Sequence, residues 1–142
     1  MNENPHEIIV ACATDDGAHL VNRHFGDAPM YALYRLSRER SEYIKTVRQG
    51  MTEIEEDSHH GASEKARGIA GLLSPHVVQV LINHAFGPNI RHVVKRFVPV
   101  VVDSPAINEA LAICRYRFDE ISEAWAQGEE RKHLVFRSSQ KE

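Results

Sequence analysis

Histidines and aspartates are concentrated in one short segment of the chain. The stretch ATDDGAHLVNRHFGDAP, residues 13–29, brings together Asp15, Asp16, His19, His24 and Asp27. A further histidine, His84, stands in the sequence NHAFG. Imidazole is the commonest metal ligand in proteins and the usual general base near neutral pH. Because the chain holds nine histidines, we take these two segments as candidates for metal binding or for acid–base chemistry.

Carboxylates offer a second possible chemistry. Asp15, Asp16 and Asp103 follow apolar runs of the sequence, and carboxylates in such places can bind Mg²⁺ and activate water. The same residues also suit a turn, at Asp15 and Asp16, and a helix start, at Asp103. A Mg²⁺-dependent phosphodiester hydrolase is therefore kept as an alternative.

A third possibility is a binding module that uses no metal. A helix is predicted to begin at Pro88, and the N-terminus of a helix attracts anions. Arg23, Arg91 and Lys95 are the cations that would accompany it, for an anion or for a partner protein. The sequence alone does not separate this possibility from the other two.

Composition excludes several classes of protein. The net charge of −3 lacks the basic excess that binding to nucleic acid requires. The start MNENPHE has no basic flank or apolar core, and no apolar run approaches the length of a membrane span. We therefore expect a cytoplasmic protein. Cys12 and Cys114, the two cysteines, fall in segments predicted to be buried and are expected to be core residues.

Three apolar runs predict the central strands of a sheet. Residues 8–13, 77–82 and 98–102 are apolar at nearly every position, which is typical of strands buried on both faces. Helical spacing in residues 87–97, between the second and third runs, predicts a right-handed βαβ unit. Ligands bind outside the carboxyl ends of parallel strands, so the segments ATDDG, NHAFGPN and DSP are expected to converge.

The remaining segments complete the predicted fold. Residues 30–36 and 41–49 read as an antiparallel meander, residues 62–73 as a helix, and residues 107–125 as one long helix ended by Gly128. The order β-β-β-α-β-α-β-α predicts a mixed five-stranded sheet with helices on both faces, a three-layer α/β domain of the ribonuclease H-like type. We assign residues 1–128 to this domain and 129–142 to a polar tail in which residues 134–136 could dock. The outer strand at 41–49 leaves a homodimer open.

Several of these segments resemble the dinitrogenase iron-molybdenum cofactor biosynthesis family. The resemblance rests on IIVACATDDG, NRHFGDAPMYALYRL, LINHAFGPNIRHVVKRFVPVVVD and NEALAI, and covers about residues 8–121. Its most specific part is the ATDDG loop followed by HFG, with the glycine–proline turn at Gly87 and Pro88 as support. Members of this family handle iron-sulfur or iron-molybdenum clusters and adopt the fold derived above.

The resemblance also implies roles for individual residues. His24, in the HFG motif, is the candidate cluster ligand, beside the alternative that it only caps a turn. Gly26 is expected to leave space for a bulky cluster. The candidate cofactor-binding residues are Asp15, Asp16, Arg23, His24, Gly26 and Gly87, and the candidate metal ligands are His24, His84, His59 and His60.

The segment DSHHGASEKARG retains His59 and His60 but has no cysteine, where many family members carry a loop rich in glycine, histidine and cysteine. Thiolates are the preferred ligands of iron-sulfur clusters, so permanent ligation is not expected. His84 is expected either to be a ligand or to bind a backbone carbonyl. The sequence thus predicts a non-catalytic carrier that transiently binds an iron-sulfur or iron-molybdenum cluster and exchanges it with donor and acceptor proteins.

Overall fold

A single mixed sheet organises the molecule in the computed structural model, which describes residues 6–49, 62–88 and 90–137. Its strands are β1 (Ile8–Thr14), β2 (Met30–Leu36), β3 (Ser41–Arg48), β4 (Val80–Asn83), β5 (Val98–Val102) and β6 (Leu134–Phe136). They lie in the order β3-β2-β1-β4-β5-β6. The prediction of five strands was wrong, because β6, within the segment predicted to be a tail, pairs with β5.

The predicted directions of the strands are confirmed. β2 is antiparallel to both β1 and β3, which makes the meander. β4 is parallel to β1 and to β5, and β6 is parallel to β5. The carboxyl ends of β1, β4, β5 and β6 therefore share one edge of the sheet, and β3 is the outer strand on the meander side.

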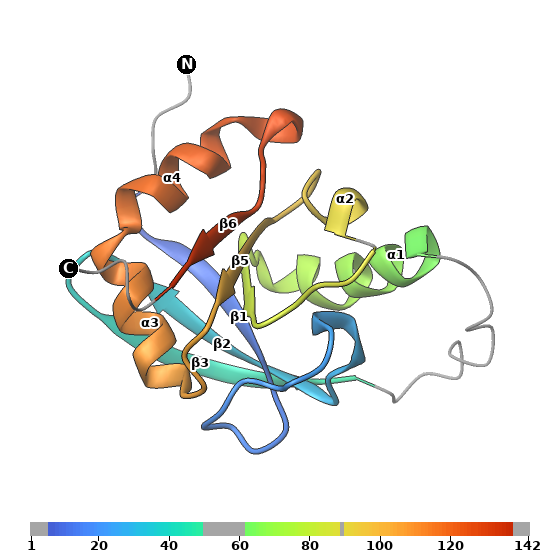
Figure 1. The fold of residues 1–142 in the computed structure, drawn as a ribbon, viewed down its shortest axis with the longest axis horizontal. Helices are drawn as coiled ribbons and strands as arrows, with labels where there is room; N and C mark the ends of the chain where they lie inside the picture. The colour runs from blue at the N-terminus through green and yellow to red at the C-terminus, as the bar shows by residue number, and fades with distance from the viewer. Residues whose placement is uncertain (1–5, 50–61, 89, 138–142) are drawn as a thin grey trace.

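Helices cover both faces of the sheet, as predicted (Figure 1). α1 (Ala62–Leu73) and α2 (Ile90–Val93) lie on one face, and α3 (Ile107–Tyr116) and α4 (Phe118–Ala126) on the other. Alternate residues of β1 enter separate cores. Val10 packs in a cluster with Phe118, whereas Ala11 packs in a cluster with Ile69 and Phe97. Two buried cores with the sheet between them make a three-layer α/β domain.

Both cysteines are core residues, as expected. Cys12 and Cys114 are fully buried in the cluster beneath α3 and α4. Burial raises the pKa of the Cys114 thiol to about 12 and that of Cys12 well above its usual value. Burial thus favours the neutral thiol at both positions and keeps both sulfur atoms away from the surface.

The predicted helix at 107–125 is divided in two. Arg117, with φ −106° and ψ 31°, separates α3 from α4. Its guanidinium lies 4.7 Å from the centre of the Phe136 ring on β6 and donates to both carboxylate oxygens of Glu120. The apolar stripe continues through the break because Cys114, Phe118 and Ile121 face the same core.

Two other predicted elements are shorter in the structure. The helix expected in residues 87–97 is a single turn, α2. The strand expected at 77–82 begins only at Val80, because Val77 adopts left-handed backbone angles, φ 61°, and is exposed. The helix predicted at 62–73 and the strand at 98–102 have the expected bounds.

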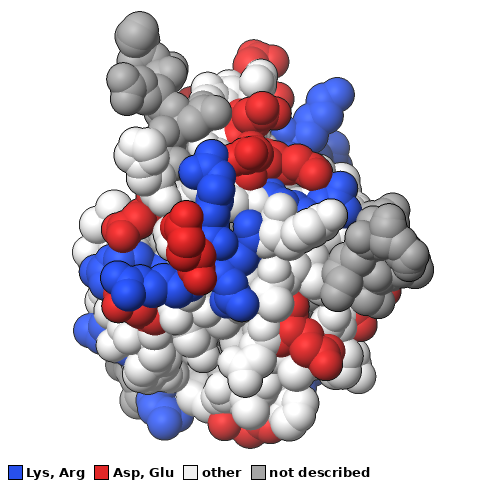
Figure 2. Space-filling view, turned by 90° about the vertical axis from the view of Figure 1, so that its left-hand side faces the viewer, with Lys and Arg blue, Asp and Glu red and all other residues white. Residues whose placement is uncertain are grey.

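Two further observations concern the length of the helices and the charges on the surface. In the part of the chain that the structure describes, no helix is both long and apolar enough to cross a membrane. Figure 2 shows a face on which basic and acidic side chains are interspersed. Two exposed ion pairs of the described residues join Arg35 to Glu42 and Arg38 to Asp119.

Candidate functional site

The loop from β1 to β2 is fastened to both neighbouring loops at the carboxyl edge of the sheet. On one side, the Leu20 amide donates to the Pro105 carbonyl and the Ile107 amide donates to the Ala18 carbonyl, each at 2.9 Å. On the other side, the Phe25 amide donates to the Ala85 carbonyl at 2.9 Å. The predicted convergence of the three strand-end segments is therefore confirmed.

Asp16 holds the first turn of this loop in place. One of its carboxylate oxygens accepts hydrogen bonds from the amides of Ala18 and His19, both at 2.8 Å, and the other lies 2.8 Å from Nδ1 of His19. The hydrogen bond from the His19 side chain, with the two amide bonds, lowers the pKa of Asp16 well below its usual value. With a longer bond from the Thr14 hydroxyl at 3.3 Å, the side-chain hydrogen bonds of Asp16 all lie within residues 14–19.

Asp15 and Arg23 form an ion pair within the same loop. Nη2 of Arg23 lies 2.8 Å from one carboxylate oxygen of Asp15 and Nη1 lies 3.2 Å from the other. The hydrogen bonds that Arg23 donates to this carboxylate raise the pKa of Arg23. Both side chains are about half exposed, so water competes for the pair.

The contacts of Asp15 and Asp16 argue against the Mg²⁺-dependent hydrolase that the sequence left as an alternative. Asp15 and Asp16 face Arg23 and His19, and Asp103 is exposed beyond the end of β5. Over residues 6–49, 62–88 and 90–137, no three side chains of His, Cys, Asp or Glu form a group that could hold a metal ion. The described part of the chain therefore contains no assembled carboxylate centre.

Asn83 joins the β1–β2 loop to the segment after β4. It is fully buried at the end of β4, and its side-chain amide donates to the carbonyl of Arg23 at 2.8 Å and of Ala85 at 3.0 Å. Sequence reasoning missed this residue. The available signal was an amide at the end of an otherwise apolar strand, since buried polar groups require partners.

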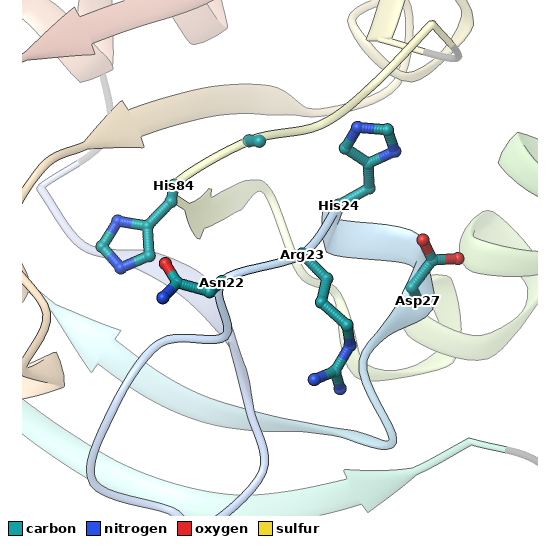
Figure 3. Close-up of a pocket in the computed structure, with 6 residues that line it drawn as sticks. Asn22, Arg23, His24, Asp27 and His84 are labelled. Atoms are coloured by element: carbon teal, nitrogen blue, oxygen red, sulfur yellow. The ribbon is translucent and has the colours of Figure 1, made fainter.

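An open pocket of about 560 Å³ lies where these two segments meet. It is lined by Asn22, Arg23, His24, Asp27, His84 and Ala85 (Figure 3). Two of the predicted metal ligands, His24 and His84, thus share a pocket. Their rings point away from each other in Figure 3, so they do not converge on a single ion.

The two pocket histidines differ in their partners. Nδ1 of His84 lies 2.9 Å from the carbonyl of Val102, as one of the two expectations for this residue had it. Because Nδ1 is used in this contact, Nε2 is the ring nitrogen that could coordinate a metal. Ligating histidines typically have this arrangement. His24 is exposed and is the N-cap residue of the 3-10 turn Phe25–Asp27, where its carbonyl accepts from the Asp27 amide at 3.0 Å. Its side chain makes no capping hydrogen bond, so the imidazole is not used by the turn.

Gly87 approaches the His24 ring very closely. A Cβ atom on Gly87 would lie 2.6 Å from Nδ1 of His24 and 2.9 Å from Cε1 and Cγ. Gly87 also has φ 76°, a left-handed conformation that favours glycine. The ring therefore rests against backbone in a place where no side chain fits.

The other candidates lie apart from this pair. Gly26 is buried in the short 3-10 turn Phe25–Asp27 and is not among the residues that line the pocket. α2 has four residues, too few to build an anion site at its start, and Arg91 and Lys95 are exposed. His59 and His60 lie outside the described residues.

Comparison with known proteins gives one family. No curated protein matches this sequence. A family model described as dinitrogenase iron-molybdenum cofactor matches residues 6–114, a range that contains β1 to β5, both pocket histidines, Asn83 and Gly87. The chain therefore belongs to the dinitrogenase iron-molybdenum cofactor family.

Proposed function

We propose that this protein transiently binds an iron-sulfur or iron-molybdenum type cluster at the carboxyl edge of its sheet and passes it on without catalytic turnover. The observation that carries the proposal is the exposed His24 imidazole. It lies on the rim of a pocket between two strand-end loops, in a chain of this family. Imidazole binds iron readily, and the ring needs no folding change to reach a cluster in solvent.

The donor set of the described residues supports a transient association. His24 and His84 are imidazole donors of the pocket, both described cysteines are buried, and the rings of the two histidines diverge. Iron-sulfur clusters held permanently have several thiolate ligands. A carrier must release its cargo, so one imidazole supplemented by polar contacts suits that role better than a complete set of thiolates.

Two residues beside His24 are proposed to assist. Arg23 lines the pocket and its guanidinium can donate hydrogen bonds to sulfide or to an anionic group of the cluster. His84, held through Nδ1, can offer Nε2. Asp15 then serves as the partner of Arg23 when cargo is absent. His59 and His60 remain proposed accessory ligands.

Several broader predictions also stay proposals. The order β3-β2-β1-β4-β5, with β2 antiparallel, supports the ribonuclease H-like assignment. A donor and an acceptor protein of a cofactor assembly pathway are the proposed partners. A cytoplasmic location and a homodimer through β3, whose Tyr43 and Ile44 are exposed, are consistent with that role.

The test is an anaerobic titration of the metal-free protein with a thiolate-capped 4Fe–4S cluster, followed by gel filtration and absorption spectroscopy. His24→Ala is compared with His133→Ala as a matched control. His133 is also an exposed histidine, but it precedes β6, at the opposite edge of the sheet. A parallel titration uses an iron-molybdenum cluster in place of the 4Fe–4S cluster.

We expect the cluster to co-elute with the wild-type protein and with His133→Ala. His24→Ala should bind at least about 10-fold more weakly, since even changes to residues behind a metal ligand cost that much. The proposal fails if neither cluster co-elutes with the wild-type protein, or if His24→Ala and His133→Ala bind equally well.

A further inference from the structure

We propose that Gly87 is a positioning residue that sets the direction of the His24 imidazole, and with it the direction from which cargo approaches. The inference deepens the proposed function and rests on it for its consequence for cargo. Its structural part, the dependence of the His24 ring on Gly87, stands on geometry and can be tested without cargo.

The close approach of ring and glycine is the first observation. A Cβ on Gly87 would come within 2.6 Å of Nδ1 of His24, a distance that real Cβ atoms essentially never show. Because His24 is exposed, its ring is free to turn aside into solvent. Any side chain at position 87 therefore displaces the ring and need not disrupt the core.

The backbone of His24 is fixed from the same segment, which is the second observation. A parallel bridge joins His24 to Ala85, and the Phe25 amide donates to the Ala85 carbonyl at 2.9 Å. The buried Asn83 amide binds the carbonyl of Arg23, directly before His24, at 2.8 Å. Because the backbone is held on both sides, the His24 side chain can change direction only by changing its rotamer. Gly87 lies against the ring and limits which rotamers fit.

Other glycines provide a matched control. Gly128 has φ 67°, close to the 76° of Gly87, yet a Cβ there would meet nothing within 4 Å. Gly128→Ala therefore places an alanine at a similar positive φ to Gly87→Ala without a collision. Gly87→Asn is a second variant, because asparagine tolerates left-handed angles better than alanine and still carries the colliding Cβ.

The experiment compares wild type, Gly87→Ala, Gly87→Asn and Gly128→Ala. The NMR signals of the His24 ring, assigned by their loss in His24→Ala, report ring orientation in the metal-free protein. Urea unfolding reports the strain, and titration with the thiolate-capped 4Fe–4S cluster reports the consequence for binding.

We expect Gly87→Ala and Gly128→Ala to lose similar amounts of unfolding free energy. Only Gly87→Ala and Gly87→Asn should shift the NMR signals of the His24 ring. The same two variants should bind the cluster about 10-fold more weakly. Unchanged ring signals in the Gly87 variants would overturn the inference, as would an equal shift in Gly128→Ala. If Gly87→Ala does not fold, Gly87→Asn decides by the same criteria, and failure of both to fold would mean that Gly87 serves the fold and not the His24 ring.

The outcomes separate this inference from the proposed function. Shifted ring signals with no cluster binding by any protein, wild type included, would refute the carrier proposal and leave the positioning of His24 by Gly87 standing. Cluster binding that depends on His24 but is equally strong in the Gly87 variants would leave the carrier proposal standing and refute the role of Gly87 in directing the approach of cargo.

Discussion

The loop from β1 to β2 and the connection from α4 to β6 are each held by an arginine, but in opposite surroundings. Arg131 is 7% exposed and donates to the carbonyls of Ala124, Trp125 and Val94, with the Trp125 ring 4.6 Å away. The Arg23 side chain is 46% exposed and faces Asp15. The buried arginine ties the end of α4 to Val94, adding to the bonds that the Gln127 amide makes with the carbonyls of Ala124 and Trp125. The exposed arginine can exchange its partner at little cost.

The difference in burial distinguishes Arg131, which stabilises the fold, from Arg23, which lies at the proposed binding site. Burial makes the hydrogen bonds of Arg131 costly to lose, because a guanidinium that is 7% exposed has little access to water in their place. Exposure makes the contacts of Arg23 and His24 weak for stability but accessible to a ligand. The comparison predicts that changes near α4 and β6 alter unfolding, and that changes in the pocket alter binding.

Arg131→Met should have the largest effect on stability. It removes the three hydrogen bonds of a buried guanidinium and its contact with the Trp125 ring, so we expect a loss of about 3 kcal/mol in the free energy of unfolding. Urea denaturation measures this loss. Arg131→Lys keeps the charge but not the planar fork and should recover only part of it. A loss below about 1 kcal/mol for Arg131→Met would mean that water replaces those hydrogen bonds.

Asn83→Ala should affect both properties, because Asn83 is buried and also holds the pocket. Its amide binds the carbonyls of Arg23 and Ala85, so we expect a loss of about 2 kcal/mol in unfolding free energy. The signals of the His24 ring should broaden as its backbone loosens. Normal His24 signals in a destabilised variant would confine Asn83 to a structural role.

Arg23→Ala tests the exposed arginine of the comparison. An exposed ion pair contributes at most about 1 kcal/mol, so unfolding should hardly change, while binding of the 4Fe–4S cluster should weaken. Asp15→Asn is the matched variant. It frees Arg23 and should leave binding equal or stronger. Weaker binding in Asp15→Asn would show that the carboxylate itself contacts cargo.

The smallest predicted effect concerns Asp16 and pH. Its pKa is lowered in the folded protein, so the folded form binds fewer protons than the unfolded form. The stabilisation is complete above the ordinary aspartate pKa, near 3.9, and is lost as the pH falls toward the lowered value. The difference in urea midpoint between wild type and Asp16→Asn should therefore shrink on acidification from neutral pH. A constant difference would contradict this.

Local patterns in the sequence predicted most of the fold. Continuous apolar runs located β1 and β5, and helical spacing located α1 with its exact bounds. β6 was not counted because three apolar residues, Leu134–Phe136, carry no periodicity, and the strand exists through its pairing with β5. The apolar stripe likewise did not predict the break at Arg117, because the stripe runs on through it.

The candidate site was predictable only in part. Topology predicted that the loops after β1, β4 and β5 converge, and the family resemblance singled out His24. Neither predicted the buried amide of Asn83, the fit of the His24 ring against Gly87, or the pairing of Asp15 with Arg23. The first two are contacts between a side chain and backbone distant in sequence, and the third joins two side chains of one irregular loop. Residue spacing along the chain does not encode either kind of contact.

Pulsed EPR of the reduced 4Fe–4S complex tests most directly the central claim that His24 binds the cluster. Protein containing isotopically labelled histidine nitrogen should show coupling between that nitrogen and the cluster. We expect the coupling in wild type and in His133→Ala, and its loss in His24→Ala. A bound cluster without histidine coupling, or with coupling that persists in His24→Ala, would contradict the account.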